Sequence, residues 1–188
     1  MTKKRTRIAV FLDRDGVINL PPEHRYIRSW AEFKFVPGTL EAIRRLASRK
    51  IPVIIVSNQS GVARGILSKK QLDSINRKML HAIRQAGGKI RKVYYCTHHP
   101  EKNCSCRKPR TGMLLKAAFR FGIDLKKSYL VGDSETDILM ARSAGCRNAL
   151  VLSGRHTRAS AKHLSVQPDR VWKDLRAAVR WILQDSAR

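Results

Sequence analysis

The sequence predicts an α/β protein, a Rossmann-like three-layer sandwich around a mostly parallel sheet. Short apolar runs rich in β-branched residues alternate with longer segments whose apolar residues recur at helical spacing. Strands that alternate with helices form βαβ units, which pair their strands in parallel. Residues 51–56 are continuously apolar, which is typical of a central strand covered on both faces. With 188 residues, 43% of them hydrophobic, the chain suits a single domain over residues 1–188.

Five strands are predicted where the apolar runs are short. They cover residues 8–12, 51–56, 92–96, 129–133 and 148–152. The helical segments begin near residue 39 and cover residues 68–85, 112–121, 136–144 and 172–183. Ser68 is expected to cap the second helix. In the helix over residues 112–121, we expect Leu114, Leu115, Ala118 and Phe121 to face the core.

The net charge is strongly positive, because 39 Lys and Arg residues face 14 Asp and Glu residues, giving +25. Such a charge indicates an anionic partner or a solubility effect. The basic residues are scattered and form no block longer than the basic tail, residues 1–6, so we expect any nucleic-acid binding to be weak and non-specific. No segment has the roughly 20 apolar residues of a membrane span, and no signal peptide is apparent. A cytoplasmic monomer with no membrane partner is therefore expected.

Polar residues lie at, or directly after, the ends of four predicted strands. These residues are Asp13, Ser57, Cys96 and Asp133. The carboxyl ends of parallel strands meet at one edge of a sheet, where α/β proteins bind their ligands. The sequence therefore predicts that motifs far apart along the chain form one site.

Three carboxylates, from Asp13, Asp15 and Asp133, are expected at this edge. Oxygen ligands in that number suit Mg²⁺, which a substrate phosphate often completes. Ser57 adds a hydroxyl and Lys108 a compact positive charge, which together predict a phosphoryl-transfer site. A bare Asp-x-Asp would fit an ordinary polar turn equally well, so the interpretation depends on the other residues.

A second metal site is predicted in residues 96–110. Its four ligands would be Cys96, His98, Cys104 and Cys106, a tetrahedral set for structural Zn²⁺. His99 fits the spacing less well. The alternatives are free thiols, or a disulfide that a reducing compartment would not keep. We expect zinc to hold the loop that carries Arg107 and Lys108.

Four segments together resemble the motifs of the haloacid dehalogenase (HAD) superfamily of phosphatases. They are Asp13-Arg14-Asp15-Gly16, Ser57-Asn58-Gln59, Lys108 and Gly132-Asp133-Ser134-x-x-Asp137. The resemblance implies a HAD fold with a nucleophile at Asp13 and a general acid/base at Asp15. It also implies that Ser57 and Lys108 hold the phosphate, that the Asp15 carbonyl joins Asp13 and Asp133 on Mg²⁺, and that Ser134 and Asp137 support the site.

Within the superfamily, residues 8–152 resemble the D-glycero-D-manno-heptose 1,7-bisphosphate 7-phosphatases. The resemblance implies hydrolysis of the 7-phosphate through an aspartyl-phosphate, in ADP-heptose and lipopolysaccharide core precursor synthesis. The gaps between motifs leave room for only a minimal cap, so the site should be open. The alternatives are a histidinol-phosphate phosphatase and, given the charge, a polynucleotide 3′-end phosphatase. A non-catalytic nucleic-acid-binding module is disfavoured because all the motif acids are present.

Substrate contacts are expected from the loop over residues 19–30, from residues 57–65 and from the zinc loop. The candidates are Asn19, His24, Tyr26, Asn58, Gln59, Ser60, Arg64 and Arg107. The family resemblance implies that Arg107 recognises the other phosphate of the substrate, a role suited to a planar guanidinium. Two departures from the family pattern are Pro21-Pro22 in the first loop and Ser134 where some members carry lysine.

Overall fold

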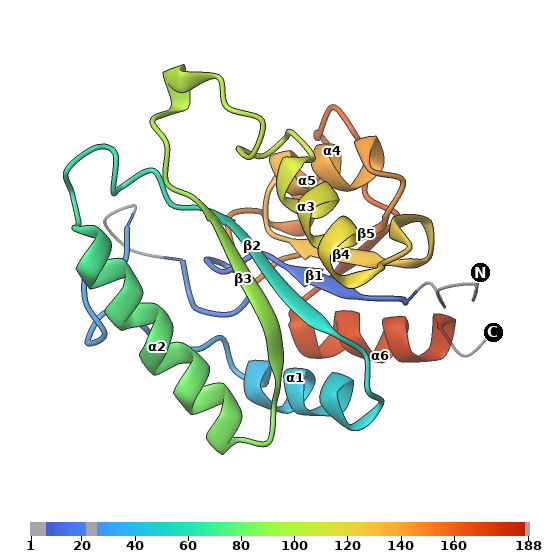
Figure 1. Ribbon diagram of the computed structural model, residues 1–188. Coiled ribbons are helices and arrows are strands. Elements are labelled where there is room, and N and C mark those ends of the chain that lie inside the picture. The colour runs from blue at the N-terminus through green and yellow to red at the C-terminus, as the bar shows by residue number, and fades with distance from the viewer. Residues whose placement is uncertain (1–6, 22–25, 187–188) are drawn as a thin grey trace, which may run out of the picture.

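The computed structural model describes residues 7–21 and 26–186 (Figure 1). Within these residues, six strands form one fully parallel sheet in the order β3-β2-β1-β4-β5-β6. Their bounds are β1 Val10–Leu12, β2 Val53–Asn58, β3 Ile90–Cys96, β4 Tyr129–Gly132, β5 Arg147–Val151 and β6 Arg170–Trp172. The predicted α/β class and parallel sheet are confirmed. The predicted basic tail over residues 1–6 lies outside the described residues.

Helices cover both faces of the sheet, which gives three layers (Figure 1). One face is covered by α1 (Thr39–Ser48), α2 (Lys69–Gln85) and α6 (Leu175–Asp185), whose apolar residues share one core cluster. The other is covered by α3 (Gly112–Phe121) and α4 (Glu135–Ser143), with the short α5 (Arg158–Ala161) beside α4. Two single-turn helices, Pro100–Lys102 and Leu125–Lys127, lie in connecting loops.

The central strands are buried on both sides, which explains their unbroken apolar sequence. In β1, Val10 and Leu12 face the cluster under α1 and α6, whereas Phe11 faces the cluster under α3 and α4. The same alternation separates Ile55 from Ile54 in β2. Successive side chains of a strand point to opposite faces, so a strand with helices on both faces is apolar at every position.

The predicted caps and boundaries hold best for the long helices. Ser68 caps α2 by accepting a hydrogen bond from the Gln71 amide at 3.1 Å, and the Gln71 side chain accepts one from the Ser68 amide at 2.7 Å. This reciprocal capping box satisfies two amides that the first turn leaves without partners.

The prediction of a helix over residues 172–183 is wrong at its start. Trp172 belongs to β6 and pairs with Val151, and α6 begins at Leu175 after the cap residue Asp174. Neither β6, with three residues, nor α5, with four, was predicted. Packing against the rest of the fold determines such short elements, because they are too short to show the apolar periodicity of a helix or a strand.

The prediction of the buried face of α3 is also wrong in part. Met113, Leu114 and Ala117 are buried, whereas Leu115 is 55% exposed and Phe119 is 93% exposed. Ala118 and Phe121 are partly buried and pack against the core as predicted, so the error is confined to Leu115, and Met113 and Ala117 complete the buried face. None of the helices within the described residues is long and apolar enough to cross a membrane.

Leu114 and Leu115 are adjacent in α3 but differ in burial, which gives a matched test of the buried face. We expect Leu114→Ala to lower the free energy of unfolding by about 2–5 kcal/mol, because it leaves a cavity in the core. Leu115→Ala should change it by no more than about 0.5 kcal/mol. Urea denaturation of both variants measures the difference, and equal losses would contradict the observed face.

Candidate active site

A cavity of about 320 Å³ lies at the carboxyl edge of the sheet. The chain runs from β1 to β2 and β3 on one side and from β4 to β5 and β6 on the other, so the strand order changes direction at β1 and β4. Such a switch point is where open parallel sheets form ligand crevices. Asp13 follows β1 and Asp133 follows β4, and both line this cavity.

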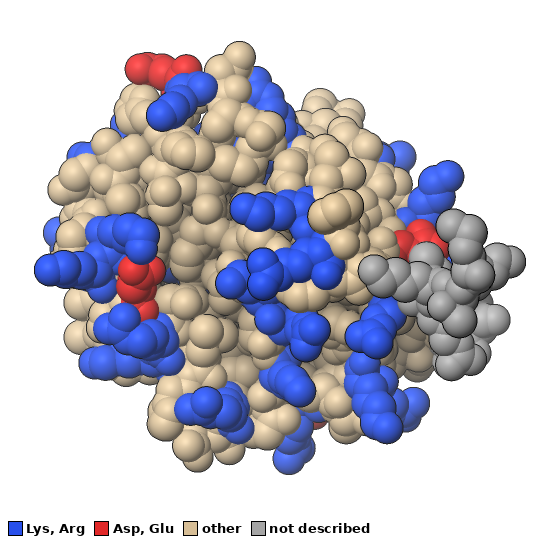
Figure 2. Space-filling view, in the orientation of Figure 1, with Lys and Arg blue, Asp and Glu red and all other residues tan. Residues whose placement is uncertain are grey.

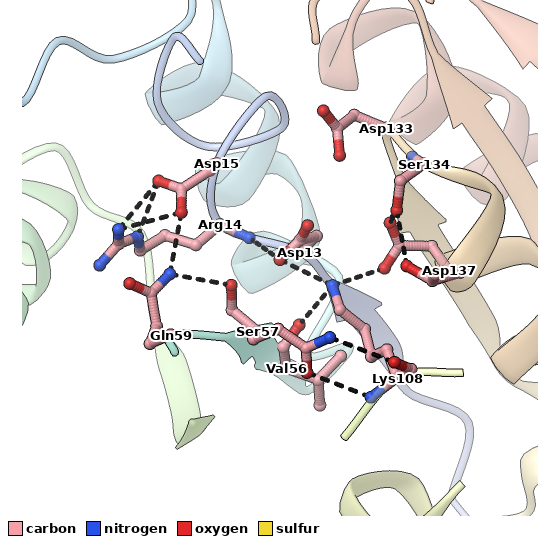
Figure 3. Close-up of polar contacts among 12 residues, drawn as sticks. Asp13, Arg14, Asp15, Val56, Ser57, Gln59, Lys108, Asp133, Ser134 and Asp137 are labelled. Carbon is pink, nitrogen blue, oxygen red and sulfur yellow. Dashed lines mark hydrogen bonds and ion pairs between the residues drawn. The ribbon is translucent and has the colours of Figure 1, made fainter. Parts of the chain in front are cut away.

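Three buried carboxylates lie together on one side of the cavity (Figure 3). Oxygen atoms of Asp13, Asp133 and Asp137 lie within 4.8 Å of one another. The Nζ atom of Lys108 lies 2.9 Å from Asp13 Oδ1 and 2.6 Å from Asp137 Oδ1. The fold therefore brings Asp13, Lys108 and Asp133 together as predicted, but the third carboxylate of the cluster is Asp137 and not Asp15.

Burial sets the protonation properties of this cluster. Burial raises the pKa of Asp13 to about 6, against the attraction of Lys108. Burial, and then repulsion from Asp13 and Asp137, raises the pKa of Asp133 to about 8. Burial disfavours the ammonium of Lys108, yet its attraction to Asp13 and Asp137 raises its pKa above the usual value. The acids therefore carry an excess of negative charge that one lysine only partly offsets.

The backbone around Asp133 leaves no room for other side chains. A Cβ atom on Gly16 would lie 2.3 Å from Asp133 Oδ2, and one on Gly154 would lie 2.2 Å from the same atom. The Arg155 amide donates a hydrogen bond to Asp133 Oδ2 at 3.2 Å. The loop after β5 therefore closes directly on this carboxylate and fixes its position.

Asp15 points away from the carboxylate cluster and toward Arg14 (Figure 3). The Arg14 Nε and Nη2 atoms donate to Asp15 Oδ1 at 3.0 and 2.9 Å, and Nη2 also donates to Oδ2 at 3.0 Å. Asn19 donates to Asp15 at 2.9 Å and Gln59 at 2.8 Å. Burial opposes the charge of Asp15, but Arg14 and the two amide donors lower its pKa below the usual value.

The second and third motifs are tied together by a pair of hydrogen bonds. The Lys108 amide donates to Asn58 Oδ1 at 3.1 Å, and Asn58 Nδ2 donates to the Lys108 carbonyl at 3.3 Å. Lys108 Nζ also donates to the Val56 carbonyl at 3.4 Å. The end of β2 therefore sets where the Lys108 ammonium lies.

The structure divides the predicted substrate contacts into two groups. Tyr26, Asn58, Ser60 and Arg107 line the cavity, as do Ser57 and Ser134. Asn19 and Gln59 are buried behind it and hold Asp15 instead, and Gln59 also donates to Ser57 Oγ at 3.2 Å. Arg64 is not part of the cavity lining, and His24 lies outside the described residues.

Three residues that the sequence analysis did not select also line the cavity, namely Pro21, Thr136 and Arg155. The side chain of Arg155 is 71% exposed, and its Nε atom lies 3.8 Å from Asp133 Oδ2. The sequence did contain a signal for Arg155. It follows the predicted strand over residues 148–152, so it must lie at the same ends of the strands as Asp13 and Asp133.

The predicted zinc ligands come together in the loop after β3. The ligand atoms of Cys96, His98, Cys104 and Cys106 all lie within 4.8 Å of one another. Cys104 Sγ is 3.5 Å from the Sγ atoms of both Cys96 and Cys106, and Cys106 Sγ is 3.3 Å from His98 Nδ1. His99 lies outside this group and faces Glu101 at 3.4 Å.

The fold and the carboxylate–lysine site are those of a HAD-type hydrolase, and comparison with known proteins agrees. The family described as HAD-hydrolase-like matches residues 105–178. The D-glycero-D-manno-heptose-1,7-bisphosphate 7-phosphatase of Thermosynechococcus vestitus is 40% identical, over 94% of this chain and 95% of its own. The D-glycero-beta-D-manno-heptose-1,7-bisphosphate 7-phosphatase of Pseudomonas aeruginosa is 36% identical, over 95% and 99%.

A solved structure shows the same similarity in three dimensions. The D,D-heptose 1,7-bisphosphate phosphatase from B. bronchiseptica, complexed with magnesium and phosphate, superimposes with a TM-score of 0.88 at 37% identity, covering 95% of this chain and 99% of that chain. The chain belongs to the D-glycero-D-manno-heptose-1,7-bisphosphate 7-phosphatase family. It is accordingly a phosphoric monoester hydrolase of the HAD superfamily.

The raised pKa of Asp133 predicts how the metal-free protein responds to pH. Because the folded-state pKa, about 8, lies above the usual 3.8, this group's contribution to stability is full below about pH 4 and is lost as the pH rises through about 8. We expect Asp133→Asn to raise the free energy of unfolding at pH 8.5 by at least about 1 kcal/mol, roughly one pKa unit.

Urea denaturation with a chelator present, at pH 5 and pH 8.5, measures this effect. The gain should be smaller at pH 5, and Asp73→Asn, on the exposed side of α2, should show no such gain. An Asp133→Asn variant with the pH dependence of the unmodified protein would contradict the assigned cause.

Proposed function

We propose that this chain is a magnesium-dependent phosphatase that removes the 7-phosphate of D-glycero-D-manno-heptose 1,7-bisphosphate. The observation that carries the proposal is the placement of Asp13 beside Lys108 and Asp133 in the cavity. The relatives named above, which match nearly the whole chain, support the choice of substrate. The reaction then belongs to ADP-heptose synthesis for the lipopolysaccharide core.

Asp13 is proposed as the nucleophile. Its carboxylate oxygen attacks phosphorus, the bond from phosphorus to the sugar oxygen breaks, and an aspartyl-phosphate forms. Lys108, 2.9 Å from Asp13, and the hydroxyl of Ser57 would hold the phosphoryl oxygens. Both side chains are buried; Ser57 belongs to β2, and hydrogen bonds to Asn58 and Val56 hold Lys108, so they favour the charge distribution of the transition state without reorganising.

The carboxylate cluster fits a hard divalent cation. Asp13, Asp133 and the Asp15 carbonyl would hold Mg²⁺, with Asp137 supporting them through Lys108 and Ser134. When bound, Mg²⁺ supplies positive charge against the phosphoryl oxygens and the nucleophile. The crowding of three buried acids around one lysine is the observation that supports this fit, because such repulsion is otherwise unfavourable.

Asp15 is proposed as the general acid and base. It would protonate the leaving sugar oxygen and then remove a proton from the water that hydrolyses the aspartyl-phosphate. In the observed arrangement, Arg14, Asn19 and Gln59 favour its ionised form, which suits the second of these steps. For the first step Asp15, which lines the cavity, must take up a proton.

Recognition of the second phosphate is proposed for Arg107. It lines the cavity next to Lys108, and its buried Nη1 atom has no hydrogen-bond partner within the described residues. A buried guanidinium nitrogen without a partner fits an anionic group of the ligand, because leaving it unsatisfied is costly. Arg155 lines the same cavity and adds a second guanidinium.

Structural zinc is proposed for Cys96, His98, Cys104 and Cys106. The mutual distances of 3.3 to 3.8 Å between their ligand atoms fit the edges of a tetrahedron around Zn²⁺, whose bonds to sulfur and nitrogen are about 2.3 and 2.0 Å. This site would fix the loop that carries Arg107 and Lys108. The single HAD-like domain over residues 1–188, the monomeric state and the cytoplasmic location stay predictions.

A panel of substrates tests the proposed function. We expect the protein with Mg²⁺ to release phosphate from heptose 1,7-bisphosphate at least about 100-fold more efficiently than from histidinol phosphate or a 3′-phosphorylated oligonucleotide, because only the first fits both phosphate contacts. NMR of the product should identify the 1-phosphate. Asp13→Asn should lower kcat by at least about 1,000-fold. Preference for the oligonucleotide would instead favour the polynucleotide phosphatase.

Two cysteine variants, one in the cluster and one outside it, test the zinc site. We expect Cys104→Ala to lose bound zinc and to raise KM more than it lowers kcat, because Arg107 is then less well held. Cys146→Ala is the matched control, since Cys146 is buried under α4, away from the cluster, and it should keep one zinc per chain. Metal analysis and steady-state kinetics measure both, and zinc retained by Cys104→Ala would refute the ligand set.

A further inference from the structure

A second cavity lies at the amino ends of the strands, opposite the active site at their carboxyl ends. It has a volume of about 260 Å³ and is formed where the chain enters the first three strands. Its lining includes four basic residues, Arg7, Lys50, Lys89 and Arg91. Its remaining lining is apolar and comes from the end of α1 and the start of β2, with Ala47, Ile51, Pro52 and Val53. We call this cavity the basic pocket.

The charges of the basic pocket are not neutralised within the described part of the chain. All four basic side chains are exposed, and none of them forms an ion pair with a described acid. Asp124, whose amide donates to the Arg7 carbonyl, uses its carboxylate to accept a hydrogen bond from the Lys126 amide. Four like charges around one concavity repel one another, so an anion bound there is favoured.

The positive surface continues beyond the pocket. The guanidiniums of Arg91 and Arg120 both lie over the ring of Phe121, at 5.0 and 5.7 Å from its centre. Arg120 is thereby linked through Phe121 to Arg91, which lines the pocket. Figure 2 shows Lys and Arg side chains in a band over β3 and the lower part of this face, with little acidic surface among them. A ligand with negative charge at more than one point along its length would match this surface.

We propose that the basic pocket and Arg120 bind single-stranded nucleic acid, with one nucleotide unit in the pocket. A nucleotide joins a phosphate, which suits the basic rim, to a flat base, which suits the apolar floor. A hollow fits such a unit better than it fits the flat surface of an anionic membrane. This interaction accounts for part of the +25 charge, which a site for one sugar bisphosphate does not require.

The proposal does not depend on the phosphatase reaction, because the two sites lie at opposite ends of the strands. Fluorescence anisotropy with a labelled 20-nucleotide dT strand that lacks terminal phosphates measures binding. Four phosphate contacts give a slope of about −2.8 for log K against log salt, which is about a 50-fold loss of affinity from 50 to 200 mM salt.

Two variants of equal charge separate the site from the overall charge. One changes Arg7, Lys50, Lys89 and Arg91 to Gln. The control changes Lys70, Arg158, Lys162 and Lys173, which are all exposed and lie outside the pocket lining, to Gln. At 50 mM salt, we expect the first variant to bind at least 10-fold more weakly, with a slope smaller by about 3, and the control to stay within about 3-fold of the unmodified protein.

Both variants should keep full phosphatase activity and unchanged unfolding, which excludes misfolding as the cause. Equal losses in the two variants would overturn the proposal, because overall charge would then explain the binding. Competition by AMP at the affinity of the 20-nucleotide strand would also overturn it and indicate a site for a free nucleotide. Binding to phosphatidylserine vesicles without binding to the strand would indicate a membrane surface instead.

Discussion

The active site depends on one buried contact, in which the Lys108 ammonium lies between the carboxylates of Asp13 and Asp137. Without it, three acids would be crowded in an apolar setting where charge repulsion and burial both favour their neutral forms. The lysine offsets part of the negative charge of these acids, and the charge that remains would suit a divalent cation. The chemistry therefore rests on charges that would be unfavourable as isolated groups.

The parallel sheet explains why these residues meet. Asp13 and Asp133 directly follow β1 and β4, and Asn58 ends β2; these strands are neighbours in space but far apart along the chain. Lys108 comes from an irregular loop, which needs its own means of support. The Asn58 side chain holds its backbone on one side, and the proposed zinc site would hold the loop on the other. The Asn58 hydrogen bonds and the proposed zinc site would therefore together hold Lys108 in position.

The two edges of the sheet differ in charge. At the carboxyl edge, acids and bases face each other at short distances and much of their charge is internal. At the amino edge, Arg7, Lys50, Lys89 and Arg91 have no acidic partners among the described residues. Charge that is not balanced locally acts on the surroundings. The positive charge of the basic pocket is therefore available to an anionic partner, whereas much of the charge in the active site is balanced by neighbouring residues.

The sequence by itself determined the parallel α/β class, the cap and extent of the longest helix, α2, and the set of motif acids and lysine, together with the cysteines and histidine proposed to bind zinc, because periodicity and residue spacing are local properties. Only the tertiary structure decided which face of α3 is buried, that β6 extends the sheet, that Asn19 and Gln59 hold Asp15, and that Arg155 reaches the cavity. These features depend on contacts between residues distant along the chain. No local pattern encodes them, because packing and pairing across the fold determine which orientation is lowest in free energy.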